Sequence, residues 1–160
     1  MAENITAATQ PASSEPRFGV QRIYIKDLSF ESPDSPESFR RPYTPSVNFN
    51  LNTRSRQLEA EVFEVVLRLT AEVKQDEKTV FLVEVQQAGI FEVAGIEGDQ
   101  LEQVLATTCP GILFPYGREA VDSLVIKASF PALMLAPINF EAIYQQAKQQ
   151  QAAQQQVPAS

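Results

Sequence analysis

The chain has 160 residues, with thirteen basic and twenty acidic side chains, a formal net charge of −7 and a sequence pI near 4.6. Its length suits one ordinary domain. An acidic surface repels nucleic-acid phosphates and anionic lipid headgroups, so the charge disfavours a nucleic-acid or membrane-surface role.

The chain begins with a polar segment, which is followed by a strand. Residues 1–16 are rich in Ala, Ser, Thr and Pro and cannot offset the entropy of ordering, so we expect a disordered arm. Residues 18–30 are rich in β-branched and aromatic side chains, which predicts a strand. Residues 31–45 contain four prolines, which exclude a regular helix or central strand and predict a long irregular connection.

Three further strands are indicated by alternating apolar and polar residues. In residues 47–52 every second residue is Asn. Residues 61–74 carry apolar side chains at every second position, namely Phe63, Val65, Leu67, Leu69, Ala71 and Val73. After a polar turn at 75–78, residues 79–87 place Leu82 and Glu84 opposite the apolar side chains. The pattern predicts an antiparallel sheet with one buried face and one exposed face.

Helical periodicity follows the strands. It begins at the N-cap candidate Asp99, and Cys109-Pro110-Gly111 is expected to interrupt this helix because a proline ring clashes with the preceding turn. A helical apolar face resumes over residues 112–129, and a last helix is predicted to open at the N-cap Asn139. Residues 149–160 form a Gln/Ala-rich segment that we expect to be a flexible tail.

The predicted fold class is therefore α+β. It comprises a four-stranded antiparallel sheet of Greek-key-like order, with a long interrupted helix and a C-terminal helix packed on one face. We expect a single domain over residues 17–148, flanked by the arm at 1–16 and the tail at 149–160.

No segment of the chain resembles a signal peptide or a membrane-spanning helix. The N-terminal residues are polar, and the longest apolar stretches, such as Ala132–Pro137, fall far below the roughly 20 residues that a spanning helix requires. The single cysteine cannot form a disulfide within the chain. These observations predict a cytoplasmic protein with no direct membrane insertion.

The sequence offers little that could catalyse a reaction. The absence of histidine removes Ser-His-Asp and Cys-His catalysis, and a single cysteine leaves no zinc site of the usual types. Glu84 could form an acid–base pair with Glu64 or Glu92, but the alternation favours solvated charges on a sheet face. Cys109 is interpreted as a packed cysteine, because no basic residue lies nearby in sequence to lower its pKa. We predict no catalytic residue, no metal and no cofactor.

Four segments carry a pattern that resembles the SecB family of protein-export chaperones over most of the chain. They are RIYIKDLSFE (22–31), EVQQAGIFEVAGIEG (84–98), CPGILFPYGRE (109–119) and FPALMLAPINF (130–140). The resemblance implies a homotetramer, built as a dimer of dimers, that binds unfolded preproteins without using ATP. It also implies delivery of these clients to the SecA ATPase.

The resemblance implies two binding surfaces. SecA docks in the family on an acidic sheet face, and the matching positions here are Asp27, Glu31, Leu82 and Glu84. The family's client-binding groove lies between the proline-rich connection and the last helix. Its candidates here are Phe39, Tyr43, Val47, Phe49, Leu51, Phe140 and Tyr144. For the three strand residues of this set, the alternation alone favours an ordinary core role.

Two features depart from the family pattern, and two other functions stay open. Gly117 lies inside a predicted helix where the family leads us to expect alanine, and the Gln-rich tail is not a hallmark of the family, whose C-terminal region also contacts SecA. One alternative is a SecB-like chaperone dedicated to a toxin–antitoxin partner. The other is a small-ligand-binding α+β domain with a pocket between helix and sheet.

Overall fold

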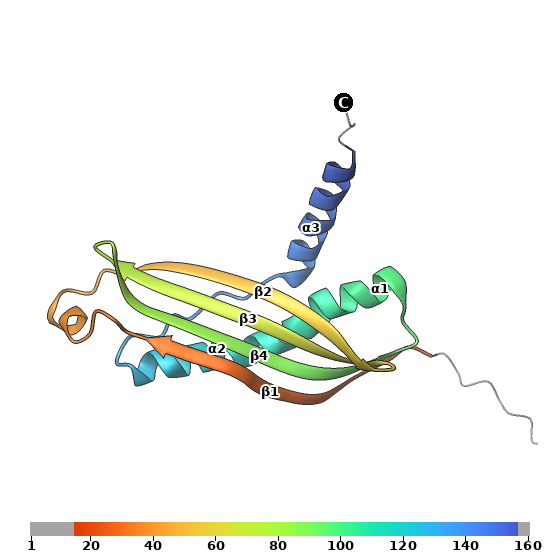
Figure 1. Ribbon diagram of the computed structural model, residues 1–160, viewed down its shortest axis with the longest axis horizontal. Helices are drawn as coiled ribbons and strands as arrows, with labels where there is room; N and C mark the ends of the chain where they lie inside the picture. Colours follow the sequence, from red (N-terminus) through yellow and green to blue (C-terminus); the bar gives the residue numbers. More distant parts are fainter. Residues whose placement is uncertain (1–14, 157–160) are drawn as a thin grey trace, which may run out of the picture.

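Four long strands form one antiparallel sheet in the computed structural model, which describes residues 15–156 (Figure 1). The strands are β1 (Arg17–Glu31), β2 (Ser46–Glu59), β3 (Val62–Gln75) and β4 (Lys78–Ala94), in the spatial order β1-β4-β3-β2. Three strands thus follow one another as hairpins, and β1 lies beside the last of them, which is the Greek-key arrangement. The predicted fold class is confirmed.

The connections between the strands match their sequences. Asp76 and Glu77 join β3 to β4 with φ values of 52° and 63°, and positive φ at both central residues gives a turn whose twist suits a two-residue hairpin. The proline-rich connection from β1 to β2 is irregular, as predicted, except for the short 3-10 helix η1 (Glu37–Arg40).

The core lies between the sheet and a long helix behind it (Figure 1). The apolar residues that alternate along β3 and β4 are almost all fully buried, which confirms the predicted buried face. Helix α2 packs against both of these central strands and contributes Leu113, Val121 and Val125 to the same cluster. Burial of this apolar surface is the main term that stabilises the fold.

The long helix consists of α1 (Gly98–Gln103), the π-helical turn η2 (Val104–Thr108) and α2 (Cys109–Lys127). The prediction that Cys109-Pro110-Gly111 breaks the helix is wrong, because the chain stays helical through these residues. The wider π turn lies immediately before Pro110, where the ring would otherwise clash with the preceding turn. The predicted N-cap is also wrong: Glu97 occupies the N-cap position of α1 without a side-chain capping hydrogen bond, and Asp99 lies in the first turn.

Helix α3 (Phe140–Gln155) begins as the sequence predicts. The side chain of Asn139 accepts a hydrogen bond of 3.0 Å from the backbone N–H of Ala142, which confirms the predicted N-cap. The helix nevertheless differs from the expectation that it packs on a face of the sheet. It contacts η2, only Phe140 of it is buried, and the remainder projects from the body (Figure 1).

The predicted domain boundaries fall near the ends of the described residues. Helix α3 continues to Gln155, so residues 149–155 of the predicted tail are helical, in keeping with the good helix propensity of Ala and Gln. Most of the predicted arm at 1–16 and the last residues of the tail lie outside the described residues.

Gly117 lies where α2 approaches the sheet closely. A Cβ atom at this position would stand 2.8 Å from Cδ1 of Leu69 and 3.4 Å from Cβ of Gln87. Leu69 is itself fully buried, so its side chain has little room to move. This close approach accounts for glycine at a helical position where alanine was expected.

Replacing Gly117 with Ala is expected to lower the free energy of unfolding, whereas the same change at exposed Gly111 should raise it. Both variants gain about 1 kcal/mol of helix propensity, and an added Cβ at Gly111 meets no heavy atom within 4 Å. At Gly117 the gain is offset by overpacking, which typically costs about 1–3 kcal/mol. Urea denaturation of the two variants measures the difference, and equal stabilisation of both would contradict the packing explanation.

Candidate functional site

The sheet has an inner face against the long helix and an outer face that is open to solvent. On β4, Phe81, Val83 and Val85 are fully buried on the inner face, so the residues between them point outward. Paired residues of antiparallel strands point to the same side. The strand register therefore assigns every other residue of the sheet to one face.

The four residues matched to SecA docking lie together at one end of the outer face. Residues paired across neighbouring strands form a row of the sheet. Glu31 pairs with Leu82 in the first of these outward-facing rows. Ser29 pairs with Glu84 in the next row, and Asp27 pairs with Gln86 in the row after that. Asp27 and Glu31 are exposed, while Leu82 and Glu84 are half-buried. Three successive rows thus present these side chains on one surface, and their docking role stays a prediction.

Two further charged residues belong to this surface and were missed from the sequence. Glu72 pairs with Leu82 and accepts a hydrogen bond of 2.8 Å from Thr79 Oγ1. Arg68 donates a hydrogen bond of 2.8 Å to Glu84, and this bond raises the pKa of Arg68. The alternation of residues 61–74 already placed both side chains on the exposed face. We refer to Asp27, Glu31, Glu72, Leu82 and Glu84 as the acidic surface.

Glu64 forms a polar network near the other end of the outer face. Its carboxylate accepts hydrogen bonds from the Tyr24 hydroxyl and from Lys26 Nζ, at 2.9 and 3.0 Å for the latter, and lies 3.4 Å from Arg56. The bonds from Tyr24 and Lys26 lower the pKa of Glu64. Burial, together with the bond to Glu64, raises the pKa of Tyr24 to about 12. The network therefore holds an ionised carboxylate beside a neutral phenol.

This network predicts how stability depends on pH. Because the pKa of Glu64 is lowered on folding, its contribution is fully present above the unfolded-state pKa and is lost as the pH falls through the folded-state pKa. Replacing Glu64 with Gln should cost about 1–3 kcal/mol at pH 7. It should also flatten the loss of stability in acid, as measured by urea denaturation from neutral pH down to the acid range. Replacing exposed Glu119 with Gln is the matched control, and an equally flattened profile in that variant would argue against the network.

The register separates the carboxylates that were considered for acid–base chemistry. Glu64 pairs with Ile90, and Glu84 pairs with Thr70, so six β3 residues, or about 20 Å, separate their rows. Glu84 is bonded to Arg68 and Glu92 to Arg17. These contacts describe solvated ion pairs of a sheet face.

Cys109 is fully buried, and its burial raises the pKa of the thiol to about 12. A thiol with so high a pKa stays protonated and is a poor nucleophile. This agrees with the interpretation of Cys109 as a packed side chain.

The aromatic residues of the proline-rich connection gather on one buried ring. Phe130 stacks on Phe39, with ring centroids 5.0 Å apart, and contacts Tyr43 at 6.0 Å. Phe81 of β4 lies 4.8 Å from the same ring. Half of Phe39 is exposed, whereas Phe130 is 6% exposed. Phe130 was not predicted from the sequence as the residue that holds the two candidates.

The three strand candidates lie on the inner face of edge strand β2. Val47 pairs with Val73, Phe49 with Ala71 and Leu51 with Leu69. Phe49 and Leu51 pack partly against the core, which supports the core interpretation for them, while Val47 is 47% exposed.

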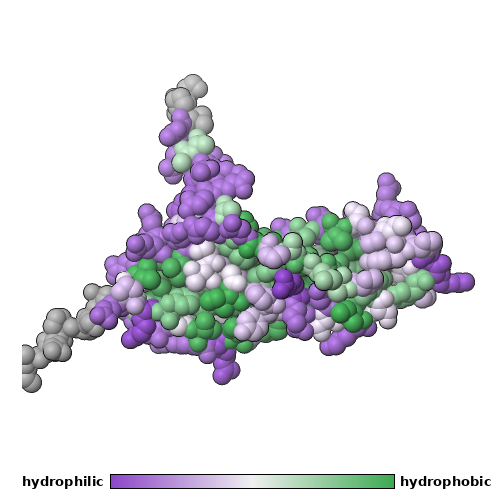
Figure 2. Space-filling model, turned by 180° about the vertical axis from the view of Figure 1, so that it is seen from behind, coloured by the Kyte–Doolittle hydropathy of each residue, from purple (hydrophilic) through white to green (hydrophobic). Residues whose placement is uncertain are grey.

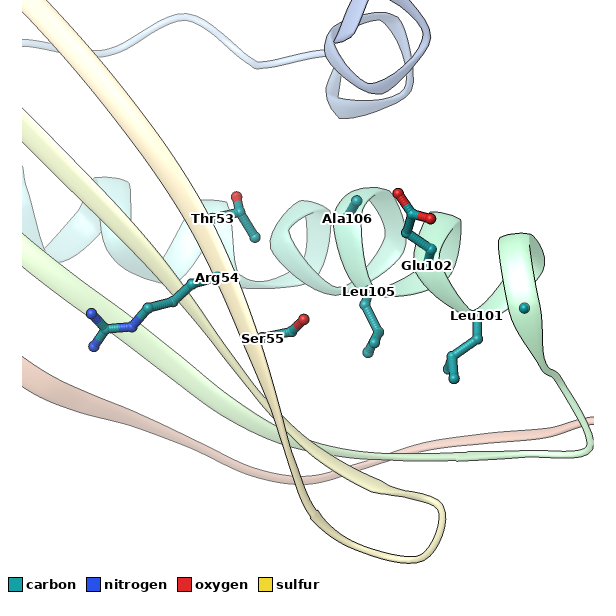
Figure 3. Close-up of a pocket in the computed structure, with 8 residues that line it drawn as sticks. Thr53, Arg54, Ser55, Leu101, Glu102, Leu105 and Ala106 are labelled. Atoms are coloured by element: carbon teal, nitrogen blue, oxygen red, sulfur yellow. The ribbon is translucent and has the colours of Figure 1, made fainter. Parts of the chain in front are cut away.

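The same strand continues into a cleft beside the long helix. This cleft of about 450 Å³ lies between β2 and the α1–η2 part of the helix, and its lining includes Thr53, Ser55, Leu101 and Leu105 (Figure 3). Ser55 is directed toward Leu105, while Arg54 points away from the helix (Figure 3). Alternation along β2 could have extended the candidate set to Thr53 and Ser55.

The two helix candidates are not joined to the loop aromatics within one chain. Phe140 packs edge-on against Phe114, with centroids 6.1 Å apart, and Lys148 lies over the ring of Tyr144. Between residues 15 and 156, no aromatic contact links either ring to Phe39 or Tyr43.

The side of the molecule opposite the view of Figure 1 carries extensive hydrophobic surface (Figure 2). Large apolar side chains are exposed on α2, on the segment after it and in the proline-rich connection, including Tyr116, Ile126, Met134 and Phe39. Exposed apolar surface of this extent is typical of sites that bind other chains.

The described residues contain no cluster of three or more potential metal ligands. Within residues 15–156, no helix combines the length and the apolar character that crossing a membrane would demand.

Comparison with known proteins gives consistent matches over most of the chain. The family described as preprotein translocase subunit SecB matches residues 11–151. Protein-export protein SecB of Marinobacter nauticus is 54% identical over 96% of this chain and 94% of its own length. The protein of the same name from Hahella chejuensis is 52% identical over 99% of this chain and 97% of its own length.

A solved structure has the same fold. It is the Mycobacterium tuberculosis SecB-like chaperone Rv1957 in complex with a ChAD peptide from the HigA1 antitoxin. The two chains superpose with a TM-score of 0.63, covering 76% of this chain and 91% of the other, at 18% identity. At that identity the likeness concerns the fold alone.

Proposed function

The chain belongs to the SecB family of protein-export chaperones, and we propose that it captures unfolded preproteins in the cytoplasm and delivers them to the SecA ATPase. Its similarity to export chaperones over nearly the full chain supports this proposal. The toxin–antitoxin alternative has weaker support, since the solved chaperone with an antitoxin peptide shares only 18% identity with this chain.

The observation that carries the proposal is the separation of two chemically different surfaces. The acidic surface lies on the outer face of the sheet, while exposed apolar side chains lie elsewhere, among them Phe39 in the proline-rich connection and Val47 on the inner face of β2. Unfolded chains differ from folded ones chiefly in exposed apolar surface, so an apolar surface selects them without reading a motif. An acidic surface suits a basic partner.

Client capture is the experiment that tests this function. The protein should bind a chemically unfolded preprotein, measured by titration calorimetry or fluorescence, and should not bind the folded form of the same preprotein. Equal binding of both forms would reject the chaperone proposal. A thermal-shift screen against metabolites addresses the small-ligand alternative, because a metabolite that binds the native state raises its melting temperature.

We further propose that the functional unit is a homotetramer, built as a dimer of dimers. Exposed Tyr116 and Ile126 on α2 would lose their contact with water on assembly. Light scattering at micromolar concentration should then give a mass near four times the 17.8 kDa of one chain. A mass near that of a single chain would reject assembly altogether, and a stable dimer would reject the dimer of dimers.

A further inference from the structure

The outer face carries a second charged region whose sign is opposite to that of the acidic surface. Arg56 pairs with Glu64, Glu64 with Ile90 and Ile90 with Arg22. Arg56 on β2 and Arg22 on β1 therefore lie at the two ends of one row of the sheet. Arg54 lies in the neighbouring row, opposite Val66. The register therefore brings basic residues of β1 and β2 to the same part of one face.

The surface of the sheet has a hollow beside Arg54 and Arg56. Its volume is about 430 Å³, and it is lined by Lys26, Arg54, Ser55, Arg56, Glu64 and Val66. We call this site the basic hollow. Arg54 points away from the long helix (Figure 3), so its guanidinium is directed toward the outer face.

The positive charge of the basic hollow is only partly neutralised. Glu64 is its one carboxylate, and the Tyr24 hydroxyl and both bonds from Lys26 already occupy its oxygens. Arg56 reaches that carboxylate only at 3.4 Å and keeps 67% of its side chain exposed. Arg54 donates to the neutral Oε1 of Gln86 at 3.1 Å and forms no ion pair within residues 15–156. A cationic site thus persists on a chain whose net charge is −7.

We propose that the basic hollow binds a short acidic peptide segment that carries carboxylates at alternate positions. Arg54 and Arg56 are two residues apart on one strand, which separates their backbone positions by about 6.6 Å. Carboxylates at alternate residues of an extended peptide have the same spacing, because they also project to one side. Each arginine offers paired N–H donors that match one carboxylate.

The surroundings of the hollow favour a short segment over a long polyanion. The row beyond Arg54 contains Asp27 and Arg68, which is paired with Glu84 of the next row, and Glu31 follows in the row after that. An extended nucleic acid or an anionic membrane would meet these carboxylates and be repelled. A segment of a few residues can contact Arg54 and Arg56 without reaching these carboxylates.

The basic hollow is separate from the surfaces assigned to clients and to SecA in the proposed function. It lies on the opposite face of the sheet from the loop aromatics, and its charge is opposite to that of the acidic surface. A result at this site therefore leaves the chaperone proposal untouched, and client capture can be measured in the same variants.

The test measures binding of a fluorescent peptide with alternating Glu and Ser residues to the full-length protein by anisotropy. The double variant Arg54→Gln/Arg56→Gln should bind at least about tenfold more weakly, since two charge-assisted bonds are removed. The matched control Lys78→Gln/Lys127→Gln changes the net charge equally but lies outside the lining of the hollow, and should bind like the unchanged protein. A peptide of the same composition with its Glu residues adjacent should also bind more weakly.

Three results would overturn the proposal. One is an equal loss of affinity in both double variants, which would indicate a response to net charge alone. Another is equal binding of the alternating and adjacent-Glu peptides. The third is binding of tripolyphosphate without binding of the peptide, which would assign the hollow to a phosphate ligand. Urea denaturation of the arginine variant checks that it remains folded.

Discussion

The Glu84→Lys variant is expected to bind SecA at least about tenfold more weakly, while its capture of unfolded clients remains unchanged. Glu84 lies on the outer face among the carboxylates of the acidic surface, so reversal replaces an attraction for a basic partner by a repulsion. Client capture depends on apolar burial elsewhere and should not respond. Surface plasmon resonance with SecA and titration with an unfolded preprotein measure the two activities separately.

The predicted role of Glu84 in SecA binding can also be tested by measuring how the affinity depends on salt. Exposed charges are screened over about 10 Å at 0.1 M salt, so the affinity that remains after removal of Glu84 should depend less on salt. Asp27→Lys should behave in the same way. Glu119→Lys on α2 makes the same change in net charge away from the acidic surface and should leave SecA binding unaltered.

Replacing Arg68 is expected to change SecA affinity in the opposite direction from Glu84→Lys. Arg68 donates a hydrogen bond to Glu84 and so competes with any basic partner for that carboxylate. Arg68→Gln should therefore strengthen SecA binding. If folded Glu84→Lys protein loses client capture and SecA binding together, or if Arg68→Gln weakens SecA binding, the separation into two surfaces is wrong. Circular dichroism establishes that each variant is folded.

The sheet could be predicted from the sequence because side-chain alternation is visible in one strand at a time. The alternation in β3 and β4 placed Leu82 and Glu84 on the outer face, and the same parity would have added Arg68 and Glu72. Contacts between different strands could not be predicted, because alternation within one strand does not give the register of its partner. Arg56 and Arg22 lie more than thirty positions apart in sequence, and only the register Arg56–Glu64–Ile90–Arg22 places them in one row of the sheet.

The helical half was harder to predict because local rules leave the outcome open. A proline inside a helix can break the helix or be accommodated by a wider turn, and η2 immediately before Pro110 shows that accommodation occurs here. The apolar residues at the start of α3 indicate that this helix packs against something. They do not identify η2 as its neighbour within the chain.

The second large effect is expected at Phe130, where truncation to Ala should lower the free energy of unfolding by about 3–5 kcal/mol. Its ring is 6% exposed and touches Phe39, Tyr43 and Phe81, so its removal leaves a cavity between the connection and the sheet. Phe39→Ala should cost about 1 kcal/mol or less, because half of that ring already faces solvent. Urea denaturation of the two variants measures this difference.

The effect of Phe39→Ala on client capture should be large although its effect on stability is small. Phe39→Ala removes an exposed ring that an unfolded chain can bury, so it should weaken capture of an unfolded preprotein while SecA binding is retained, and adding Tyr144→Ala should weaken capture further. Met134→Ala also removes exposed apolar surface, at 79% exposure, but lies outside the candidate groove and serves as the control.

If Phe39→Ala destabilises the protein as much as Phe130→Ala does, the Phe39 ring is part of the core. If Phe39→Ala leaves client capture unchanged in a folded protein, the loop aromatics do not form the client site. A stable Phe39→Ala protein that has lost client capture would show that the connection holds its recognition ring on a buried anchor, so that binding and folding depend on different members of one aromatic cluster.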